Sequence, residues 1–181
     1  MRLRTASNGN PAARMLALSQ PLILAVFLLA SAAGAQTSSP QALLHKQAPA
    51  VLRHDLNGQP LSLARLRGKV VLLNFWASWC GPCLTEMPQF MAWQRQYAAQ
   101  GLRVVGISMD DDVASARKLV TRLKVDYPIA MGDPVLGRSY GVLGLPLTFL
   151  IDRKGQVRAV YQGVSNLKAM DGQINALLAE H

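Results

Sequence analysis

The stretch "NFWASWCGPCLTEMP", residues 74–88, holds both cysteines of this 181-residue chain, three positions apart. It follows the hydrophobic run "GKVVLLNFWA", residues 68–77, which shows none of the alternation of a half-exposed strand. Such a run is typical of a strand that is buried on both faces. The cysteines are therefore expected where a buried strand ends and a helix begins. Two thiols at that place can form a structural disulfide, contribute to a metal site or act as a redox couple.

Strand and helix patterns alternate on both sides of this stretch. The segment "VLRHDLNGQPLSL" predicts a hairpin around Asn57-Gly58, a dipeptide that favours tight turns between strands. Downstream we expect, in chain order, a helix over 83–99, a strand over 102–109, a helix from 113 that Asp110 to Asp112 can cap, a short strand within 127–133, a short helix or turn over 134–142, two strands over 147–152 and 157–163, and a helix over 166–181. This order predicts an α/β domain with a thioredoxin-like fold: a mixed central sheet, helices on both faces and an N-terminal β-hairpin.

The first 35 residues have the pattern of a secretory signal peptide. A basic segment without acids is followed by the apolar run 21–30 and then by Ala33 and Ala35, small residues that flank a cleavage site. The alternative is an uncleaved inner-membrane anchor, since the apolar stretch approaches the length that spans a bilayer. Residues 36–47 are expected to form a linker and residues 48–181 the folded domain. Either interpretation places that domain outside the cytoplasm.

The charge pattern gives little sign of a nucleic-acid partner. The formal net charge is +9, and it falls to +6 without the three arginines of the first 35 residues. The remaining basic residues are scattered and are not interleaved with aromatic residues, unlike those of a nucleic-acid surface. We therefore expect a solvated basic surface and no nucleic-acid partner. We also expect a monomer.

The position of the cysteines gives each a different expected role. Cys80 would stand at the N-terminus of the helix, where free N–H groups and the helix dipole favour a thiolate. That setting lowers a cysteine pKa from about 8.5 to about 7 or below. Cys80 is then the exposed nucleophile, and Cys83, one turn on and more buried, the resolving thiol. Gly81 admits a partner backbone, and Pro82 fits the first helical turn.

A structural disulfide or a metal site explains the pair less well. A disulfide that closes a four-residue loop removes little entropy from the unfolded chain. Zinc requires about four ligands, and no histidine follows the cysteines at ligand spacing. We therefore expect a redox-active disulfide between Cys80 and Cys83, with no metal and no other cofactor.

These motifs resemble a known family. "FWASWCGPC" resembles the thioredoxin superfamily, and "WCGPCLTEMPQF", preceded by G-x-P-L-S-L-x-x-L-x-G-K-V-V, resembles its exported TlpA/ResA-like branch. The resemblance runs from about Ala48 to the C-terminus and includes "YGVLGLPLTFLIDRKG", residues 140–155. It implies that Pro146 is cis and faces the disulfide. It also implies that the backbone of Leu145 pairs with a substrate strand.

The chain departs from its relatives at Asn74 and at Leu147, and it matches the exported branch at Glu86. Asn74 replaces the buried aspartate of cytoplasmic thioredoxins and cannot exchange a proton. Glu86 matches a glutamate position of the exported branch, and we assign it proton transfer to and from Cys83; the alternative is an exposed helix carboxylate. Leu147 stands where many relatives have a small hydroxyl residue, at a position expected to line the substrate groove.

The two tryptophans that flank the site receive different interpretations. Trp79 is expected to offer partners an exposed apolar platform, which interfaces favour. Trp76 is expected to pack in the core.

The resemblance implies a periplasmic or otherwise extracytoplasmic thiol:disulfide oxidoreductase. We expect a reductase of protein disulfides, recharged by a membrane thiol reductant of the DsbD/CcdA type and acting on substrates such as apocytochrome c during cytochrome c maturation. Three alternatives stay open: a disulfide-donating oxidase, a thiol peroxidase and a copper- or cytochrome-binding module. A peroxidase would need a threonine and a proline just before its attacking cysteine, and "NFWASW" offers neither.

Overall fold

A computed structural model describes residues 39–180 of the chain. The expected signal peptide or anchor, residues 1–35, and the start of the expected linker lie outside the described residues. Within residues 39–180, no helix is long and apolar enough to cross a membrane.

The centre of the fold is a five-stranded sheet with the order β5-β4-β3-β6-β7. Its first three strands run parallel, and β6 and β7 are antiparallel to their neighbours. The central strand β3 is buried along its whole length, as its apolar run, interrupted only by Asn74, predicts. The strands are β3 (Val70–Trp76), β4 (Leu102–Ser108), β5 (Ile129–Met131), β6 (Leu147–Ile151) and β7 (Val157–Gln162).

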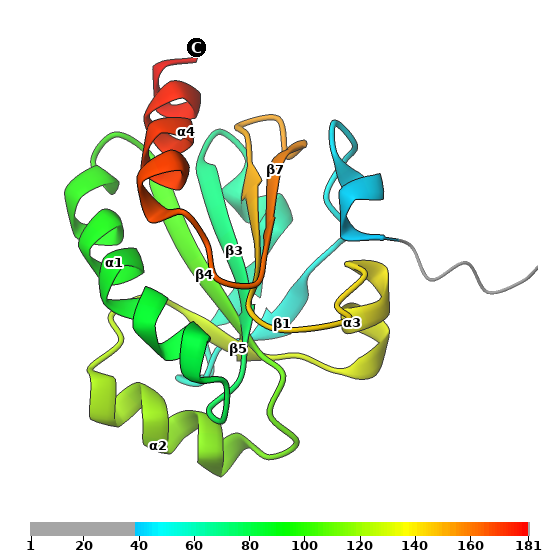
Figure 1. Cartoon of the computed structure of the whole chain (residues 1–181), viewed down its shortest axis with the longest axis vertical. Helices are drawn as coiled ribbons and strands as arrows, with labels where there is room; N and C mark the ends of the chain where they lie inside the picture. Colours follow the sequence, from blue (N-terminus) through cyan, green and yellow to red (C-terminus); the bar gives the residue numbers. More distant parts are fainter. Residues whose placement is uncertain (1–38, 181) are drawn as a thin grey trace, which may run out of the picture. The chain divides into compact units, whose positions relative to one another are not determined.

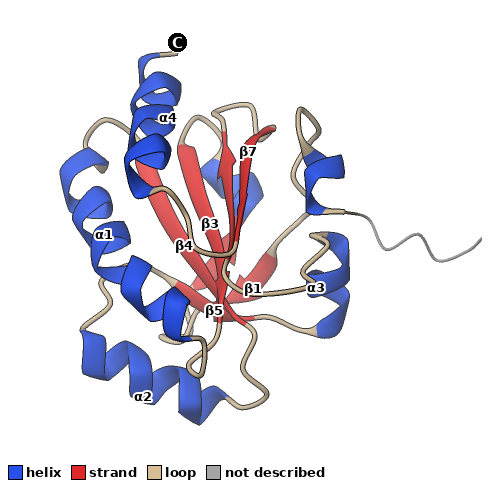
Figure 2. Ribbon diagram, in the orientation of Figure 1, coloured by secondary structure: helices blue, strands red, loops and turns tan. Residues whose placement is uncertain are grey.

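Helices cover both faces of the sheet (Figure 1). Helices α1, α2 and α4 lie on one face, and α3 lies on the other (Figure 2). The helices are α1 (Gly81–Tyr97), α2 (Val113–Leu123), α3 (Pro134–Ser139) and α4 (Leu167–Ala179), with 3-10 helices η1 (Pro40–Leu43) and η2 (Leu63–Leu66). The predicted mixed sheet with helices on both faces is therefore confirmed.

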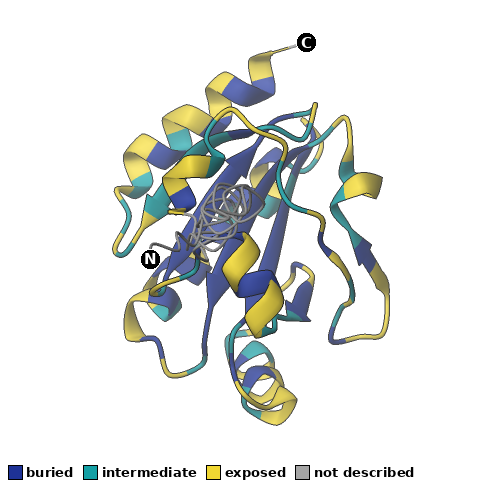
Figure 3. Ribbon diagram, turned by 90° about the vertical axis from the view of Figure 1, so that its right-hand side faces the viewer, coloured by how far each residue is buried: buried dark blue, intermediate teal, exposed yellow. Residues whose placement is uncertain are grey.

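Alternate side chains of each strand feed two apolar cores, one on each face of the sheet. On β3, Leu72 and Trp76 pack beneath α1 and α4, whereas Leu73 and Phe75 pack toward α3. The helices bury one side and expose the other (Figure 3). Opposite faces of the same strand thus hold α1 and α3 in place.

The predicted hairpin is present as β1 (Leu52–His54) and β2 (Pro60–Ser62). In its turn, Oδ1 of Asp55 accepts the N–H groups of Asn57 and Gln59, each at 2.8 Å. Gly58 takes a positive φ of 79°, which glycine adopts without steric cost. The N–H of Leu56 then donates to the carbonyl of Ile129 on β5, so the hairpin is fastened to the edge of the sheet.

Part of the segment expected as a linker is packed on the domain. The N–H of His45 donates to the carbonyl of Val157, and the N–H of Val157 donates to that of Lys46. Because η1 begins at Pro40, the folded part of the chain extends toward the N-terminus beyond residue 48. Sequence composition favoured a linker here since it does not reveal such backbone pairing.

Helix α2 begins close to the predicted position. Asp112 is its N-cap and accepts the N–H of Ser115 at 2.8 Å. Ala116 and Leu119 are buried, three residues apart on one face of the helix. Val113, which has the same helical spacing, is 45% exposed, because the first turn of α2 projects beyond the core.

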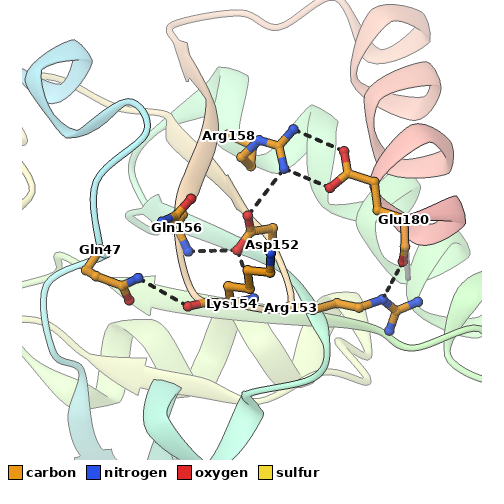
Figure 4. Close-up of polar contacts among 7 residues, drawn as sticks. All are labelled: Gln47, Asp152, Arg153, Lys154, Gln156, Arg158 and Glu180. Atoms are coloured by element: carbon orange, nitrogen blue, oxygen red, sulfur yellow. Dashed lines mark hydrogen bonds and ion pairs between the residues drawn. The ribbon is translucent and has the colours of Figure 1, made fainter.

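Two arginines hold the end of the domain where α4 finishes (Figure 4). Arg158 forms ion pairs with Glu180 of that end and with Asp152 after β6. The Arg153 guanidinium donates to four backbone carbonyls, those of Gly68, Gln100, Leu178 and Glu180. It thereby satisfies carbonyl groups that the end of a helix leaves without partners.

Candidate active site

The pairing of β3 with β6 brings the predicted site residues to one edge of the sheet. Phe75, near the end of β3, lies opposite Leu147, the first residue of β6. The segment after β3 that carries the cysteines and the segment before β6 that carries Pro146 therefore meet at the same edge. The two segments are more than sixty residues apart in the sequence, and the antiparallel pairing of β3 with β6 brings them together.

Cys80 and Cys83 form a disulfide at the N-terminus of α1, with an S–S distance of 2.00 Å. Cys80 is the N-cap of the helix, and its Sγ accepts the N–H of Cys83 at 3.3 Å. The helix dipole is thus directed at the Cys80 sulfur, which favours its thiolate in the reduced protein.

The two cysteines differ less in exposure than predicted. In this disulfide form Cys80 is 5% exposed and Cys83 is 1% exposed. Cys80 is the more exposed of the two, as expected, but it is not an open surface residue, because it belongs to the buried apolar cluster on the α1 side of the sheet. Gly81 and Pro82 form the exposed first turn of α1, and an added Cβ at Gly81 would meet no described atom within 4 Å.

The tryptophans lie where the sequence predicts. Trp79 is 71% exposed beside Cys80, and Trp76 is completely buried beneath α1. Trp79 therefore presents an apolar surface next to the disulfide.

Glu86 is buried, so the alternative of an exposed helix carboxylate is wrong: only 3% of the residue is exposed. It lies one helical turn after Cys83 on the same face of α1. Its Oε1 accepts the backbone N–H of Ser165 at 2.9 Å, while Oε2 has no hydrogen-bond partner among the described residues. Burial raises the pKa of the Glu86 carboxyl, and the Ser165 hydrogen bonds oppose that rise.

The turn between β7 and α4 connects Pro146 with Glu86. The Leu145–Pro146 peptide bond is cis, as the family resemblance implies. The carbonyl of Pro146 accepts the N–H of Gly163 at 2.9 Å, and Ser165, two residues later, donates to Glu86. Pro146 is buried and Leu145 is half-buried. One short turn therefore contacts both the proline segment and the glutamate.

Leu147 does not line a groove beside the disulfide. It is completely buried and packs in the core on the α3 side of the sheet, with Phe75 and Phe149. The alternation of β6 turns it away, and Thr148 is the residue that faces α1. Nδ2 of Asn74 donates to Oγ1 of Thr148 at 2.9 Å, so this pair of buried side chains contains no ionisable group.

A carboxylate that the sequence pattern predicts only as a helix cap supports the loop before Cys80. Asp110 is buried and accepts the N–H and the hydroxyl of Ser78 at 3.0 Å and 2.7 Å. It also accepts the hydroxyl of Ser108 at 2.7 Å. The sequence signal for this role is its position just after a buried strand, because residues that follow β3 and β4 meet at the same edge of the sheet.

The predicted site residues thus come together at one edge of the sheet: Trp79 and Cys80 from the loop after β3, Gly81, Pro82, Cys83 and Glu86 from α1, and Leu145 and Pro146 from the segment before β6. Within residues 39–180, no group of three or more His, Cys, Asp and Glu side chains is arranged to hold a metal ion.

Comparisons with known proteins agree with this geometry. Residues 44–160 match the AhpC/TSA family. The chain is 32% identical over 134 residues to the thiol-disulfide oxidoreductase ResA of Bacillus thuringiensis (strain Al Hakam), covering 73% of this chain and 77% of that protein. It is also 32% identical over 133 residues to the thioredoxin-like protein YneN of Bacillus subtilis (strain 168), covering 72% of this chain and 78% of that protein.

A solved structure supports the same conclusion. The thiol:disulfide interchange protein of the thioredoxin family from Chlorobium tepidum TLS superposes with a TM-score of 0.68 at 30% identity. The match covers 74% of this chain and 96% of that one. The thioredoxin-like fold is therefore confirmed, and the chain belongs to the AhpC/TSA family, in its branch of ResA-like thiol-disulfide oxidoreductases.

Proposed function

We propose that the protein is an exported reductase of protein disulfides that works through the Cys80/Cys83 couple. The observation that carries the proposal is the position of Cys80 as N-cap of α1, directly bonded to the more buried Cys83. A nucleophile at a helix N-terminus with a second thiol behind it can form a mixed disulfide and then resolve it.

The reaction transfers two electrons from the dithiol to the substrate. The Cys80 thiolate attacks one sulfur of a substrate disulfide, forms a mixed disulfide and displaces the first substrate thiolate, which takes up a proton. Cys83 then loses its proton and attacks the Cys80 sulfur. This step forms the Cys80–Cys83 disulfide and releases the second substrate thiolate. The substrate leaves as a dithiol, and the protein is left in the disulfide form that the structure contains.

Glu86 is the proposed acceptor of the Cys83 proton. It lies one turn away on the same helix face, and its Oε2 has no hydrogen-bond partner among residues 39–180. Burial raises the pKa of this carboxyl, which brings it closer to the pH at which a thiol must lose its proton. Asn74 stands where cytoplasmic thioredoxins have a buried aspartate, and its amide cannot accept the Cys83 proton.

The surface around Cys80 suits an extended polypeptide. Trp79 supplies an exposed apolar side chain, and Gly81 and Pro82 leave open space above the first turn of α1. We assign the backbone of Leu145, before the cis Pro146, to pairing with the substrate strand.

Export and the identity of the partners follow from the sequence pattern and the family resemblance. A domain outside the cytoplasm needs a reductant in the membrane, and we propose a thiol transporter of the DsbD/CcdA type. The proposed substrates are proteins with oxidised cysteine pairs, among them apocytochrome c before haem attachment.

Trapping of mixed disulfides tests the function directly. Cys83→Ala should accumulate covalent complexes with exported partner proteins, since Cys80 attacks and no thiol resolves the product. Cys80→Ala is the matched control and should trap none. The absence of complexes with Cys83→Ala would contradict a reductase of protein disulfides.

The reduction potential separates a reductase from an oxidase. The couple is expected to lie near the value of reducing thioredoxins, about −270 mV. A value near about −120 mV, typical of an oxidising catalyst, would contradict the reductase and favour the disulfide-donating alternative.

A further inference from the structure

A groove of about 190 Å³ lies beside the loop that leads into Cys80. One wall is Ser78 of that loop, and the other is α2. The groove is lined by Ser78, Ser115, Lys118, Leu119 and Arg122. Because Ser78 is two residues before Cys80, their Cα atoms are at most about 7 Å apart. A polypeptide bound to the Cys80 sulfur can therefore reach the groove within a few residues.

The charged side chains of the groove are both cations. Lys118 and Arg122 are one helical turn apart, so their side chains lie on the same face of α2. Both residues are exposed, and neither forms an ion pair within residues 39–180. The floor of the groove is supplied by Leu119, which is buried.

Two of the three acids before α2 are engaged by neighbouring polar groups, and the third, Asp111, is exposed. Asp110 accepts hydrogen bonds from Ser78 and Ser108. Asp112 caps α2 and accepts both the N–H and the hydroxyl of Ser115. These carboxylates reduce the positive charge at the start of α2, but they leave Lys118 and Arg122 without an acidic partner.

The other cations of this segment lie elsewhere and provide an internal comparison. Arg117 lines a different groove, next to Tyr127 and the β1–β2 hairpin, and Lys124 is the C-cap of the helix. A flat anionic surface would contact the exposed cations that share one face of the helix and would need no concave site. A concave groove lined by two of them and placed beside the reactive cysteine suits a single acidic side chain of a bound polypeptide better.

We propose that the groove formed by Ser78, Lys118 and Arg122 binds an acidic side chain of the substrate polypeptide, close in sequence to its reactive cysteine. This inference rests on the proposed function, because it names a feature of the substrates that Cys80 attacks. The groove would thus select among oxidised proteins by charge and add to the apolar contact of Trp79.

The test compares reduction rates of three peptides with the full chain in its dithiol form. Each peptide contains the same intramolecular disulfide. The three differ at one position, about two to four residues from a cysteine, which is Glu, Gln or Lys. An extended chain of that length reaches from the Cys80 sulfur to the groove. The wild type should reduce the Glu peptide roughly threefold to tenfold faster than the Gln peptide, as expected for one or two exposed charge pairs. The preference should shrink at high salt.

Two pairs of substitutions locate the effect. In the variant Lys118→Gln/Arg122→Gln, the reduction rate of the Glu peptide divided by that of the Gln peptide should fall to about one. The variant Lys118→Glu/Arg122→Glu should instead reduce the Lys peptide fastest. The matched control Arg117→Gln/Lys124→Gln removes the same charge from the same helix segment and should keep the wild-type ratio. Equal loss of the ratio in both Gln pairs would overturn the groove as the binding site.

The remaining outcomes distinguish this inference from the proposed function. Equal reduction of all three peptides by the wild type would overturn the acidic preference and leave the reductase intact. Failure to reduce any peptide would contradict the reductase itself, and with it this inference. Binding to phosphatidylglycerol vesicles that is lost in Lys118→Gln/Arg122→Gln, with no change in peptide preference, would assign the cations to a membrane surface and overturn the proposal.

Discussion

The backbone N–H of Ser165 donates a hydrogen bond of 2.9 Å to Oε1 of Glu86, across 79 residues of sequence. The contact fixes the carboxylate in the interior, one helical turn from Cys83, and leaves its second oxygen without a partner in the described part of the chain. The turn that supplies Ser165 also binds the carbonyl of Pro146 through Gly163. The proposed proton acceptor and the proposed substrate-binding segment thus share one support.

Glu86→Gln should change how stability depends on pH. Burial raises the pKa of the Glu86 carboxyl, so the folded chain binds this proton more tightly than the unfolded chain. The resulting stabilisation is present below the unfolded pKa and is lost as pH rises through the folded pKa. Gln cannot ionise, so the free energy of unfolding of the variant should increase relative to wild type as pH rises above the unfolded value of about 4.3. Urea unfolding at several pH values checks this, and parallel pH curves would contradict it.

Asp110→Ala should destabilise the loop before Cys80. The substitution leaves the N–H and hydroxyl of Ser78 and the hydroxyl of Ser108 without their acceptor. The expected cost is about 1–3 kcal/mol of unfolding free energy, with faster hydrogen exchange at the Ser78 amide. Asp111→Ala is the control, since Asp111 is exposed and adjacent. Similar losses for both variants would argue against the Asp110 contacts.

Arg153→Met should weaken the attachment of α4. The guanidinium donates to the carbonyl of Glu180 (Figure 4) and also to those of Leu178, Gly68 and Gln100, so its loss releases four acceptors. We expect a loss of about 1–3 kcal/mol in thermal or urea unfolding. Lys154→Met removes the neighbouring, exposed cation and should change stability by less than about 0.5 kcal/mol. A loss after Lys154→Met as large as that after Arg153→Met would indicate an effect of charge alone.

Local patterns in the sequence were sufficient for most of the fold. The largely apolar run before the cysteines identifies β3, because a strand covered on both faces shows no alternation of apolar and polar residues. Asn57-Gly58 predicts the hairpin, since its turn needs a residue that accepts a positive φ. The cysteine spacing placed Cys80 at the start of α1, where the structure has it as N-cap.

The features that the sequence left open depend on contacts between distant segments. The burial of Glu86 requires the turn at Ser165, and the support of Ser78 by Asp110 requires the ends of β3 and β4 to lie side by side. The family resemblance placed Leu147 beside the groove, but the residue lies on the opposite face of β6, because the face on which a strand residue lies depends on register. Composition likewise could not reveal that residues 45–48 pair with the sheet.

The central claim, that the Cys80 sulfur is the activated nucleophile because it caps α1, is tested most directly by alkylation of the reduced protein. Iodoacetamide at about pH 7, followed by peptide mapping, measures the rate at each cysteine. The account predicts that Cys80 reacts at least about tenfold faster than Cys83, as a thiolate at a helix N-terminus should. Equal rates at the two sulfurs, or faster reaction at Cys83, would contradict it.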